Sequence, residues 1–314
     1  MFSLIKNEMV KIFEKKSNWV YILILILAVV IGGVIQQKIY EKPSKNWREE
    51  TQKELNQLQK DMVKAPKEDK DLINKQIQQK QVYLDENINP NAVSNWHFLN
   101  GTVIGMTMLV TLFAVIVSSA SVSSEFADGT IKQLLIRPHQ RWSILLSKYI
   151  SLLIYSLLLL VILIVAGYIV GLVLFGNGDF NSKIIETSLE GQKVTVVGTQ
   201  FFLKTLYYLP GLLITITIAF MLSTLFRSQA LAVGIGIFVL FLSSTLGGVM
   251  VLLAEKYTWA KFLIFPHLDL TVYALQDRIL QDVTLPISLL TLAVYYIIFL
   301  MVTFIFFQKR DINI

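Results

Sequence analysis

Long uncharged stretches alternate with shorter polar ones along the whole chain. Six of them each hold about 20 mainly apolar residues, the length of α-helix that crosses a hydrocarbon layer of ~30 Å. A charge at the bilayer centre costs about 2.5–3.5 kcal/mol on insertion scales, so the spans are placed between formal charges. They cover residues 17–37, 98–124, 149–178, 205–226, 228–254 and 283–308. The pattern predicts an all-α polytopic membrane protein with six transmembrane helices.

The orientation follows from Lys and Arg in the short loops, which are enriched on the cytoplasmic side. With the N-terminus inside, cytoplasmic segments carry Lys6, Lys11, Lys15, Lys16, Lys132, Arg137, Arg141, Lys148, Arg227, Lys309 and Arg310. The short outer loops carry fewer: Lys183, Lys193, Lys204, Lys256, Lys261 and Arg278. Both termini are therefore predicted to face the cytoplasm. The first span is interpreted as a retained anchor, because its apolar core from 19 to 35 is longer than that of a signal peptide.

These assignments divide the chain into thirteen consecutive segments. They are an interfacial helix over 1–17, a span over 18–37, an extracellular helical hairpin over 38–97, a span over 98–120, a cytoplasmic loop over 121–147, a span over 148–175, an extracellular β-hairpin region over 176–203, a span over 204–226, a cytoplasmic turn over 227–229, a span over 230–254, extracellular re-entrant helices over 255–286, a span over 287–307 and a cytoplasmic tail over 308–314.

Periodicity gives the aqueous segments their predicted form. Phe2, Ile5, Met9 and Ile12 share one helical face, which indicates an amphipathic helix at the inner membrane surface with its lysines near anionic headgroups; an ordinary polar lead-in is the alternative. Between 41 and 88, apolar residues repeat at helical spacing on both sides of Pro66, which favours a helical hairpin. That hairpin is either a cap or partner site, or a solvated spacer.

The last two extracellular segments differ from each other in composition. Residues 183–197 are rich in β-branched side chains on either side of Glu190-Gly191, which predicts a β-hairpin. Residues 255–286 are aromatic and are interrupted by Pro266, which favours two short helices dipping into the outer leaflet.

Composition agrees with a bilayer as the main solvent. The 314 residues are 54% hydrophobic and only 16% charged, against about 25% charged in soluble domains. A formal charge of +6 would suit nucleic acid, but the excess of Lys and Arg on cytoplasmic loops accounts for it, so no nucleic-acid partner is expected. The chain has no cysteine, which excludes disulfides and thiol catalysis.

Two pairs of glycines and one proline lie inside the predicted spans. Gly101 and Gly105 share the small-xxx-small spacing of Gly167 and Gly171, which permits close helix contact and is interpreted as packing. Pro210 either kinks the fourth span and shapes a gate, or is a harmless proline near a helix end.

The loop between the second and third spans carries the most informative motif, SVSSEFADGTIKQLLIRPHQRW over 121–142. Asp128, Gly129 and Thr130 predict a turn and a helix N-cap, and Pro138 ends the short helix that follows. Trp142 and Lys148 are expected to anchor the start of the next span. A short rigid helix displayed at the cytoplasmic face can be gripped by another protein.

This segment resembles the cytoplasmic loop of type-2 ABC exporter permeases, the membrane subunits of bacterial ATP-driven exporters. The motif of that family combines an acidic residue, Gly-Thr, a Leu pair, a Pro and a basic residue. The matching positions are Glu125, Gly129, Thr130, Leu134, Leu135, Pro138 and Arg141. The motif covers about 25 residues, whereas the resemblance in architecture covers the whole chain. The polar segment over 41–88 is larger than that of many family members.

The resemblance implies a function and a set of partners. Residues 130–138 would form a coupling helix that docks on an ATP-binding subunit, with Glu125 and Arg141 flanking it. Two such subunits would bind ATP and Mg²⁺ and rock this chain against a second, identical or similar permease. The cargo would be hydrophobic or amphipathic, such as a peptide, an antibiotic or a lipid, and the location the bacterial plasma membrane.

The sequence lacks the residues that several kinds of catalytic and binding site require. No phosphate-binding G-x-x-x-x-G-K-[ST] motif occurs, so ATP chemistry is assigned to a partner chain and this chain is expected not to be an enzyme. No carboxylate pair and no ionisable residue lies in a span core, which disfavours an intramembrane hydrolase or an ion-coupled transporter. His97, His139 and His267 fall in separate loops, so no metal site is expected.

A second function class stays open. The chain would then be a non-transporting membrane sensor or scaffold that uses its 38–97 segment as a receptor. A neighbouring gene for an ATP-binding cassette protein favours the permease, whereas a neighbouring histidine kinase without one favours the sensor. An ion-independent facilitator is disfavoured because no internal repeat is evident.

Overall fold

A computed structural model describes residues 1–39, 46–130, 140–188, 191–280 and 282–310. The chain divides into two compact units. Unit 1 comprises 1–28, 104–166 and 203–314, and unit 2 comprises 29–103 and 167–202. Three helices contribute residues to both units: α2 (Lys16–Ile39), α9 (Arg141–Phe175) and α10 (Val197–Leu225).

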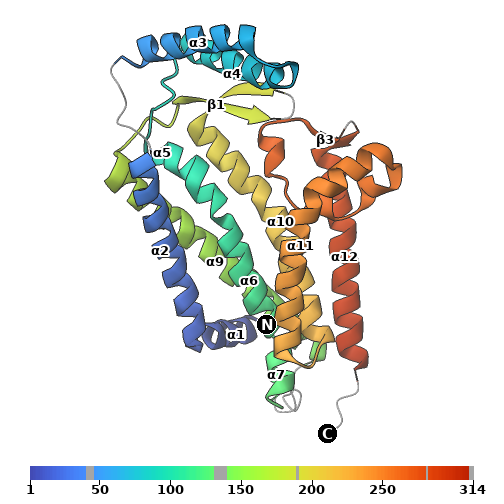
Figure 1. Ribbon diagram of the computed structural model, residues 1–314. Coiled ribbons are helices and arrows are strands. Elements are labelled where there is room, and N and C mark those ends of the chain that lie inside the picture. Colours follow the sequence, from blue (N-terminus) through green and yellow to red (C-terminus); the bar gives the residue numbers. More distant parts are fainter. Residues whose placement is uncertain (40–45, 131–139, 189–190, 281, 311–314) are drawn as a thin grey trace. The chain divides into compact units, whose positions relative to one another are not determined.

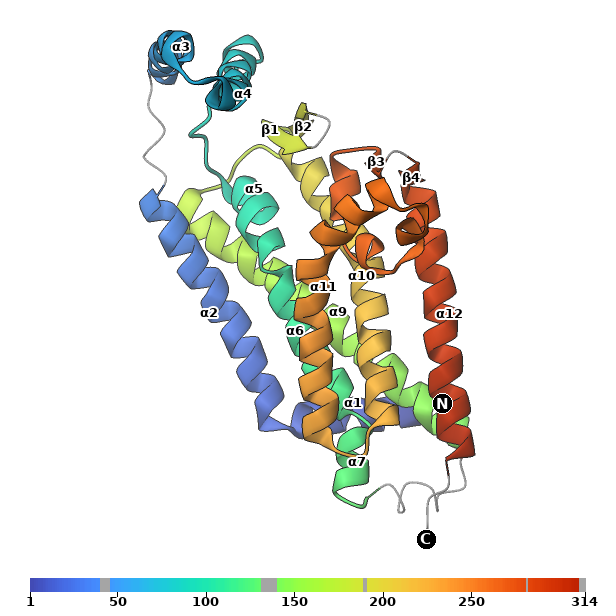
Figure 2. The same ribbon diagram turned by 45° about the vertical axis from the view of Figure 1, so that its right-hand side comes forward.

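Unit 1 is a helical bundle with a crosswise N-terminal helix. Besides its parts of α2, α9 and α10, it contains α1 (Phe2–Glu14), α6 (Thr107–Ala120), α7 (Ser123–Ala127), α11 (Gln229–Lys256) and α12 (Leu285–Lys309). Helices α6, α10, α11 and α12 run side by side, and α1 lies across their ends near α7 (Figures 1 and 2). Lys15 separates α1 from α2 with extended backbone, so the amphipathic helix and the first span are distinct elements.

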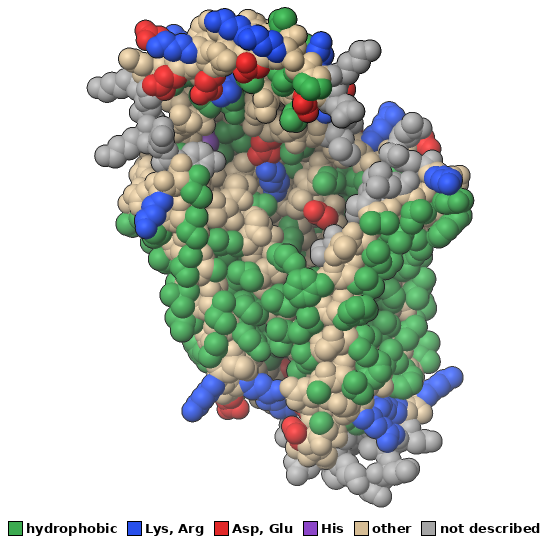
Figure 3. Space-filling view, in the orientation of Figure 1, with side chains coloured by type: hydrophobic (Ala, Val, Ile, Leu, Met, Phe, Trp, Pro, Cys, Tyr) green, Lys and Arg blue, Asp and Glu red, His purple; other side chains and the backbone are tan. Residues whose placement is uncertain are grey.

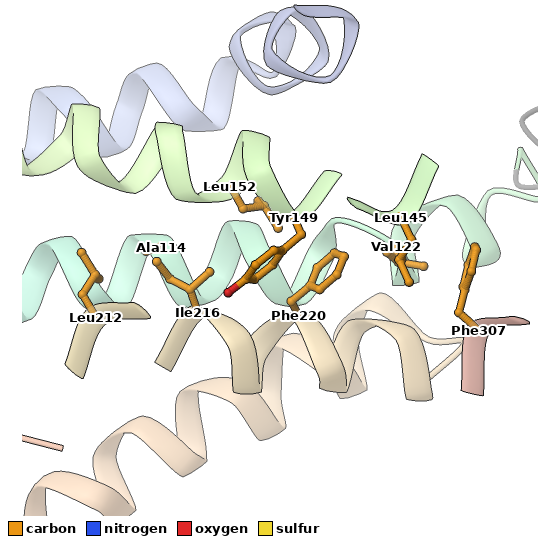
Figure 4. Packing of buried hydrophobic residues seen from close by; sticks show 9 residues of the cluster. All are labelled: Ala114, Val122, Leu145, Tyr149, Leu152, Leu212, Ile216, Phe220 and Phe307. Atoms are coloured by element: carbon orange, nitrogen blue, oxygen red, sulfur yellow. The ribbon is translucent and has the colours of Figure 1, made fainter. Parts of the chain in front are cut away.

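The core of unit 1 lies between α6, α9, α10 and α12. Tyr149 and Leu152 of α9 face Ile216 and Phe220 of α10, and Phe307 of α12 closes one end (Figure 4). Ile12 of α1 packs against the same cluster from its edge. The amphipathic N-terminal helix therefore turns part of its apolar face toward protein rather than toward lipid alone.

Five helical segments of the described chain are long and apolar enough to cross a membrane. They are Lys16–Ile39, Thr107–Ala127, Arg141–Phe175, Val197–Leu225 and Leu285–Lys309. The fifth predicted span, 228–254, coincides with α11, whose apolar stretch within the described side chains, Gln229–Ser243, is shorter than a span requires. The structure is that of a mostly helical, multi-pass membrane protein, and the count of six spans stays a prediction.

The second predicted span differs from the continuous helix expected over 98–120. The short helix α5 (Asn95–Phe98) passes into a π-helical turn, η1 (Leu99–Val103), and α6 begins only at Thr107. Asn100, Gly101 and Thr102 occupy the π-turn, and all three residue types have a low α-helix propensity. The Asn100 amide also donates from Nδ2 to Glu186 Oε1 at 2.5 Å, a contact that the looser turn permits.

Two further boundaries also differ from the predictions. Helix α9 begins at Arg141, inside the predicted cytoplasmic loop, because no helix-breaking residue follows Pro138. Helix α10 begins at Val197, directly after the second strand, so the predicted linker up to 203 is helical. Pro210 lies within the helix α10, and the backbone oxygen of Leu268 lies so near the adjacent Gly211 that no side chain would fit there.

Unit 2 holds the predicted helical hairpin. Helices α3 (Trp47–Lys64) and α4 (Lys67–Asp85) are antiparallel and break at Ala65-Pro66, which confirms that prediction (Figure 2). Charged side chains gather over both helices, whereas apolar side chains cover the visible face of α11 and α12 in unit 1 (Figure 3). The surface of each element thus matches the solvent predicted for it.

A β-hairpin and a glycine-mediated helix contact complete unit 2. Strands β1 (Lys183–Ser188) and β2 (Gly191–Val196) pair antiparallel as predicted. Gly167 contacts Leu99 and Val103, and Gly171 contacts Asn95 and Phe98, so this glycine pair does serve packing. A Cβ at Gly101 or Gly105 would meet no other atom within 4 Å, so that pair makes no helix contact within the described chain, and a contact across a dimer stays a prediction.

Residues 255–286 of unit 1 contain more elements than the two short helices predicted. Three short 3₁₀ helices occur, η2 (Thr258–Phe262), η3 (Phe265–His267) and η4 (Thr271–Ala274). A small antiparallel pair follows, β3 (Arg278–Leu280) with β4 (Val283–Thr284). The pair was missed because its strands are too short to show an alternating pattern.

Candidate functional site

The predicted coupling segment begins at α7, a short helix that follows α6. Glu125 lies on α7, and Asp128 ends that helix. Gly129 has φ +70°, a left-handed conformation that glycine adopts without strain. The turn over 128–130 is therefore confirmed, but it closes α7, and a helix that begins there lies outside the described residues.

The remaining predicted site residues divide between described and undescribed parts of the chain. Leu134, Leu135 and Pro138 lie outside the described residues. Thr130 is exposed, and its hydroxyl donates to the backbone oxygen of Glu125 at 3.4 Å. Arg141 is exposed at the start of α9 and donates to the backbone oxygen of Arg310 at 3.3 Å.

Glu125 belongs to an ion-paired group that connects three segments of unit 1. Its Oε1 accepts from Lys148 Nζ of α9 at 2.6 Å and from Lys11 Nζ of α1 at 3.1 Å. Glu8 of α1 accepts from the same two ammonium groups, at 2.7 Å from Lys148 and 2.9 Å from Lys11. These four residues, Glu8, Lys11, Glu125 and Lys148, are called the inner cluster below.

Burial makes the inner cluster stronger than an ordinary surface pair. The Lys148 side chain is 3% exposed and the two carboxylates are each 13% exposed, whereas Lys11 is 46% exposed. Two cations and two anions balance, so desolvation of each group is offset by opposite charge at hydrogen-bond distance. Removing one member would leave a charge buried without compensation. Lys148 thus points into the protein and does not anchor the span at the membrane surface, as its position had suggested.

The ion pairs shift the pKa values of Glu8 and Lys11, the two cluster members on α1. Burial alone would raise the pKa of Glu8, but Lys148 and Lys11 outweigh it and hold the pKa below the ordinary value of 4.5. Burial would likewise lower the pKa of Lys11, but Glu8 and Glu125 raise it above its ordinary value. Both shifts favour the charged forms of Glu8 and Lys11 at neutral pH.

Backbone contacts fix α7 to α10 as well. The Ser223 hydroxyl of α10 accepts from the backbone N–H groups of Val122 at 2.9 Å and Ser123 at 3.0 Å. Arg310, directly after α12, places its guanidinium over the Phe126 ring at 4.2 Å. The N-terminal helix, the 121–130 segment and the end of α12 consequently meet at one end of unit 1.

A cavity of about 500 Å³ adjoins the inner cluster. Besides Glu8, Glu125 and Lys148, it is lined by Asp128 and Thr130 of the predicted coupling segment. The second carboxylate oxygen of Glu125, Oε2, is buried and has no hydrogen-bond partner among the described residues. The printed contacts among Glu8, Lys11, Glu125 and Lys148 are ion pairs, so the cluster links its elements electrostatically.

Sequence reasoning named Glu125 but not its partners. Glu8 and Lys148 lie 140 residues apart, and Lys148 looked like an ordinary positive charge at the start of a span. The only signal in the sequence is that Glu8 lies among the lysines of an amphipathic helix, which does not reveal a distant partner.

The two histidines that the structure describes each pair with a serine. His97 accepts or donates through Nδ1 with Ser94 Oγ at 2.7 Å in unit 2, whereas His267 in unit 1 pairs with Ser288 Oγ at 2.8 Å. His139 lies outside the described residues. Across the described parts of the chain, no group of three or more His, Cys, Asp or Glu could hold a metal ion.

Comparison with known proteins gives the chain its relatives. A family model described as "Protein of unknown function (DUF2705)" matches residues 70–313. The "Uncharacterized protein YhcI" of Bacillus subtilis (strain 168) is 35% identical over 316 residues, with 99% of each chain covered. The "Uncharacterized membrane protein YdbK" of the same organism is 29% identical over 213 residues, covering 67% of this chain and 80% of the relative. No solved structure matches.

Proposed function

Given that this chain belongs to the DUF2705 family, we propose that it is the membrane-spanning permease subunit of an ATP-driven exporter in the bacterial plasma membrane. It would have six spans and both termini in the cytoplasm. Two copies of a separate ATP-binding subunit would supply ATP and Mg²⁺, and a second permease, identical or similar, would complete the transporter. The motif from Glu125 to Arg141 supports this proposal by resemblance.

The inner cluster is the observation that carries the proposal. An ATP-driven permease must convert a push on one cytoplasmic loop into movement of several helices. Lys148 contacts both Glu8 and Glu125, so α1, α7 and α9 are joined by buried charge-assisted hydrogen bonds. A displacement of the 121–130 segment would therefore move α1 and α9 with it, which a solvated loop could not achieve.

A cavity between α6, α10 and α11 supports a hydrophobic or amphipathic cargo. It has a volume of about 600 Å³ and mainly apolar walls. Its hydroxyl groups include Thr111, Tyr208 and Thr215, and the Tyr208 hydroxyl pairs with Thr111 Oγ1 at 2.7 Å. Within the proposal, these groups would offer polar contacts along an otherwise apolar path.

Co-purification with the ATP-binding subunit tests the proposal. The subunit encoded beside this chain would be co-expressed with it, and complex formation and ATPase activity would be measured in nanodiscs. Combining Gly129→Pro with Leu135→Asp should abolish assembly, because proline cannot adopt the conformation of Gly129 and Asp disrupts an apolar docking surface. Leu72→Asp, at an exposed position on α4, is the matched control. Unchanged assembly and ATPase stimulation in the first variant would sink the assignment.

The alternative function, a membrane sensor or scaffold, is favoured by one feature of unit 2. The α3–α4 hairpin is a formed element whose Val63 and Leu72 side chains are 81% and 62% exposed. Such positions suit a partner contact. Under this alternative, replacing both residues by Ser would abolish partner binding, and the variants at 129 and 135 would leave it intact.

A further inference from the structure

Every polar side chain that lines the cavity between α6, α10 and α11 ends in oxygen. Six hydroxyl groups and one carboxylate contribute to the lining, and all of them belong to unit 1. The other described residues around the cavity are apolar or glycine. Its volume of about 600 Å³ lies inside the range of about 300–1,000 Å³ typical of sites for drug-sized molecules. It is called the bundle cavity below.

Three of the hydroxyl groups donate their protons to the backbone of their own segment. Thr215 and Ser243 each donate to the backbone oxygen four residues earlier, at 2.8 Å and 2.6 Å. Thr107 donates to the backbone oxygen three residues earlier, at 2.7 Å. A hydroxyl group has one proton and two lone pairs, so each of these groups has only acceptor capacity left for a ligand.

The other three hydroxyl groups also use their protons within the chain. The Tyr208 hydroxyl and Thr111 Oγ1 lie 2.7 Å apart, and they lie 3.0 Å and 3.3 Å from the backbone oxygen of Thr107. Whichever of the two donates to the other, the second donates to that backbone oxygen. Thr271 Oγ1 donates to Asp269 Oδ1 at 2.5 Å. The polar side chains of the bundle cavity therefore present hydrogen-bond acceptors to its interior.

Asp269 adds a formal charge, the one such charge among the described lining residues. Its Oδ1 accepts from the backbone N–H of Thr271 at 3.0 Å and from the Thr271 hydroxyl, and both donors are uncharged. Within the described chain, no ion pair joins Asp269 to a cation. The side chain is exposed, so a ligand can reach it. Acceptor oxygens and an unbalanced carboxylate attract positive charge to the cavity and repel negative charge.

We propose that the bundle cavity binds lipophilic cations, molecules that carry a positive charge on an apolar body. The charge lies beside Asp269 and the hydroxyl oxygens, and the apolar body contacts walls that include Ile218, Val239 and Leu240. An anion of the same shape would meet lone pairs and a carboxylate of like charge. Naming these cations as the cargo rests on the proposed transport function, whereas their binding is a property of this chain alone.

Two ions of the same shape and opposite charge test the sign of the preferred ligand. The full-length chain in phosphatidylcholine nanodiscs would be equilibrated with tetraphenylphosphonium or with tetraphenylborate, and empty nanodiscs would be subtracted for partition into lipid. Tetraphenylphosphonium should bind saturably, and tetraphenylborate should not. Saturable binding of both ions with similar affinity would overturn the proposal. Saturable binding of neither ion, the result expected of a cavity filled by lipid chains, would overturn it as well.

Asp269→Asn tests the role of the carboxylate. Asparagine keeps Oδ1 as the acceptor for Thr271, so the turn is retained while the charge is removed. The affinity for tetraphenylphosphonium should fall about 5-fold, the effect of a unit charge about 4 Å away in water, and Asp269→Glu should retain most of it. Asp277→Asn, which removes an exposed carboxylate of the same segment outside the cavity lining, is the matched control. Unchanged affinity in Asp269→Asn would refute the site.

Gly105→Leu tests whether the apolar body lies in the bundle cavity. Gly105 lines the cavity, and a Cβ there would meet no atom within 4 Å, so leucine fits and takes up space that the ligand needs. Saturable binding of tetraphenylphosphonium should be lost. Gly234→Leu on α11, in equally open space but outside the lining, is the matched control. Undiminished binding by Gly105→Leu would contradict the proposal.

The binding measurements need no ATP-binding subunit, so they fail independently of the proposed function. A chain that assembles with its ATPase but binds no lipophilic cation would refute this inference and leave the permease assignment standing. A chain that binds the cation as expected but assembles with no ATPase would support the site and refute the permease assignment.

Discussion

The inner cluster of unit 1 and the Asn100–Glu186 contact of unit 2 both bury polar groups, but they balance charge differently. Both place polar side chains in buried surroundings and join elements that are distant in sequence. The inner cluster pairs two cations with two carboxylates. The contact in unit 2 joins a carboxylate to a neutral amide, and the amide oxygen has no partner among the described residues. The comparison indicates that loss of one charge from the inner cluster, where every charge faces an opposite one, should cost more stability than loss of the neutral amide contact.

Removing the central cation should break the inner cluster with the largest effect on stability. Lys148→Met leaves Glu8 and Glu125 buried with only the half-exposed Lys11 between them. Breaking a buried ion pair from one side costs about 3–5 kcal/mol. Thermal unfolding in detergent should show the loss, and Lys6→Met on the exposed face of α1 should show almost none.

The double variant Lys148→Met with Glu125→Gln sharpens that test. Neutralising one carboxylate removes part of the like-charge repulsion, so the double variant should be more stable than Lys148→Met alone. If it is less stable, the charges do not interact as the distances indicate.

The next largest loss of stability should come from overpacking the contact between Gly167 and Val103 in unit 2. A Cβ at Gly167 would lie 2.6 Å from the Val103 side chain, so Gly167→Leu forces α9 and the π-turn apart. Overpacking of this kind costs about 1–3 kcal/mol. Gly101→Leu has the free space that Gly167 lacks, so its melting temperature should stay close to that of the unchanged chain.

The pH dependence of thermal stability tests the contribution of Glu8 to the inner cluster. The pKa of Glu8 is lowered on folding, so its contribution is fully present above the ordinary value of 4.5 and is lost as the pH falls through the lowered value. Thermal stability should therefore drop on acidification below about pH 4.5, and Glu8→Gln should flatten that part of the profile. An identical acid profile in the variant would contradict the assignment.

The smallest effect should come from an exposed charge pair of unit 2. Lys183 and Glu86 are 54% and 41% exposed, so Lys183→Gln should change the free energy of unfolding by no more than about 1 kcal/mol. A loss as large as that of Lys148→Met would remove the distinction between buried and exposed pairs.

The sequence by itself determined which segments form long apolar helices and which form polar elements. Uncharged stretches of span length predicted the long helices, Pro66 predicted the break between α3 and α4, and β-branched residues around Glu190-Gly191 predicted β1 and β2. These features are local, because hydrophobic length, proline sterics and turn chemistry act within a few residues. The motif up to Arg141 also located the segment that carries Glu125.

Only the tertiary structure decided which polar groups meet. Glu8 pairs with Lys148 across 140 residues, and Asn100 reaches Glu186 across 86. Neither pairing follows from spacing, because a charge at the end of a span can face water, lipid headgroups or a buried partner. The π-turn was hidden for the same reason. Its stability depends on the contact that Asn100 makes in the folded chain, which no local pattern encodes.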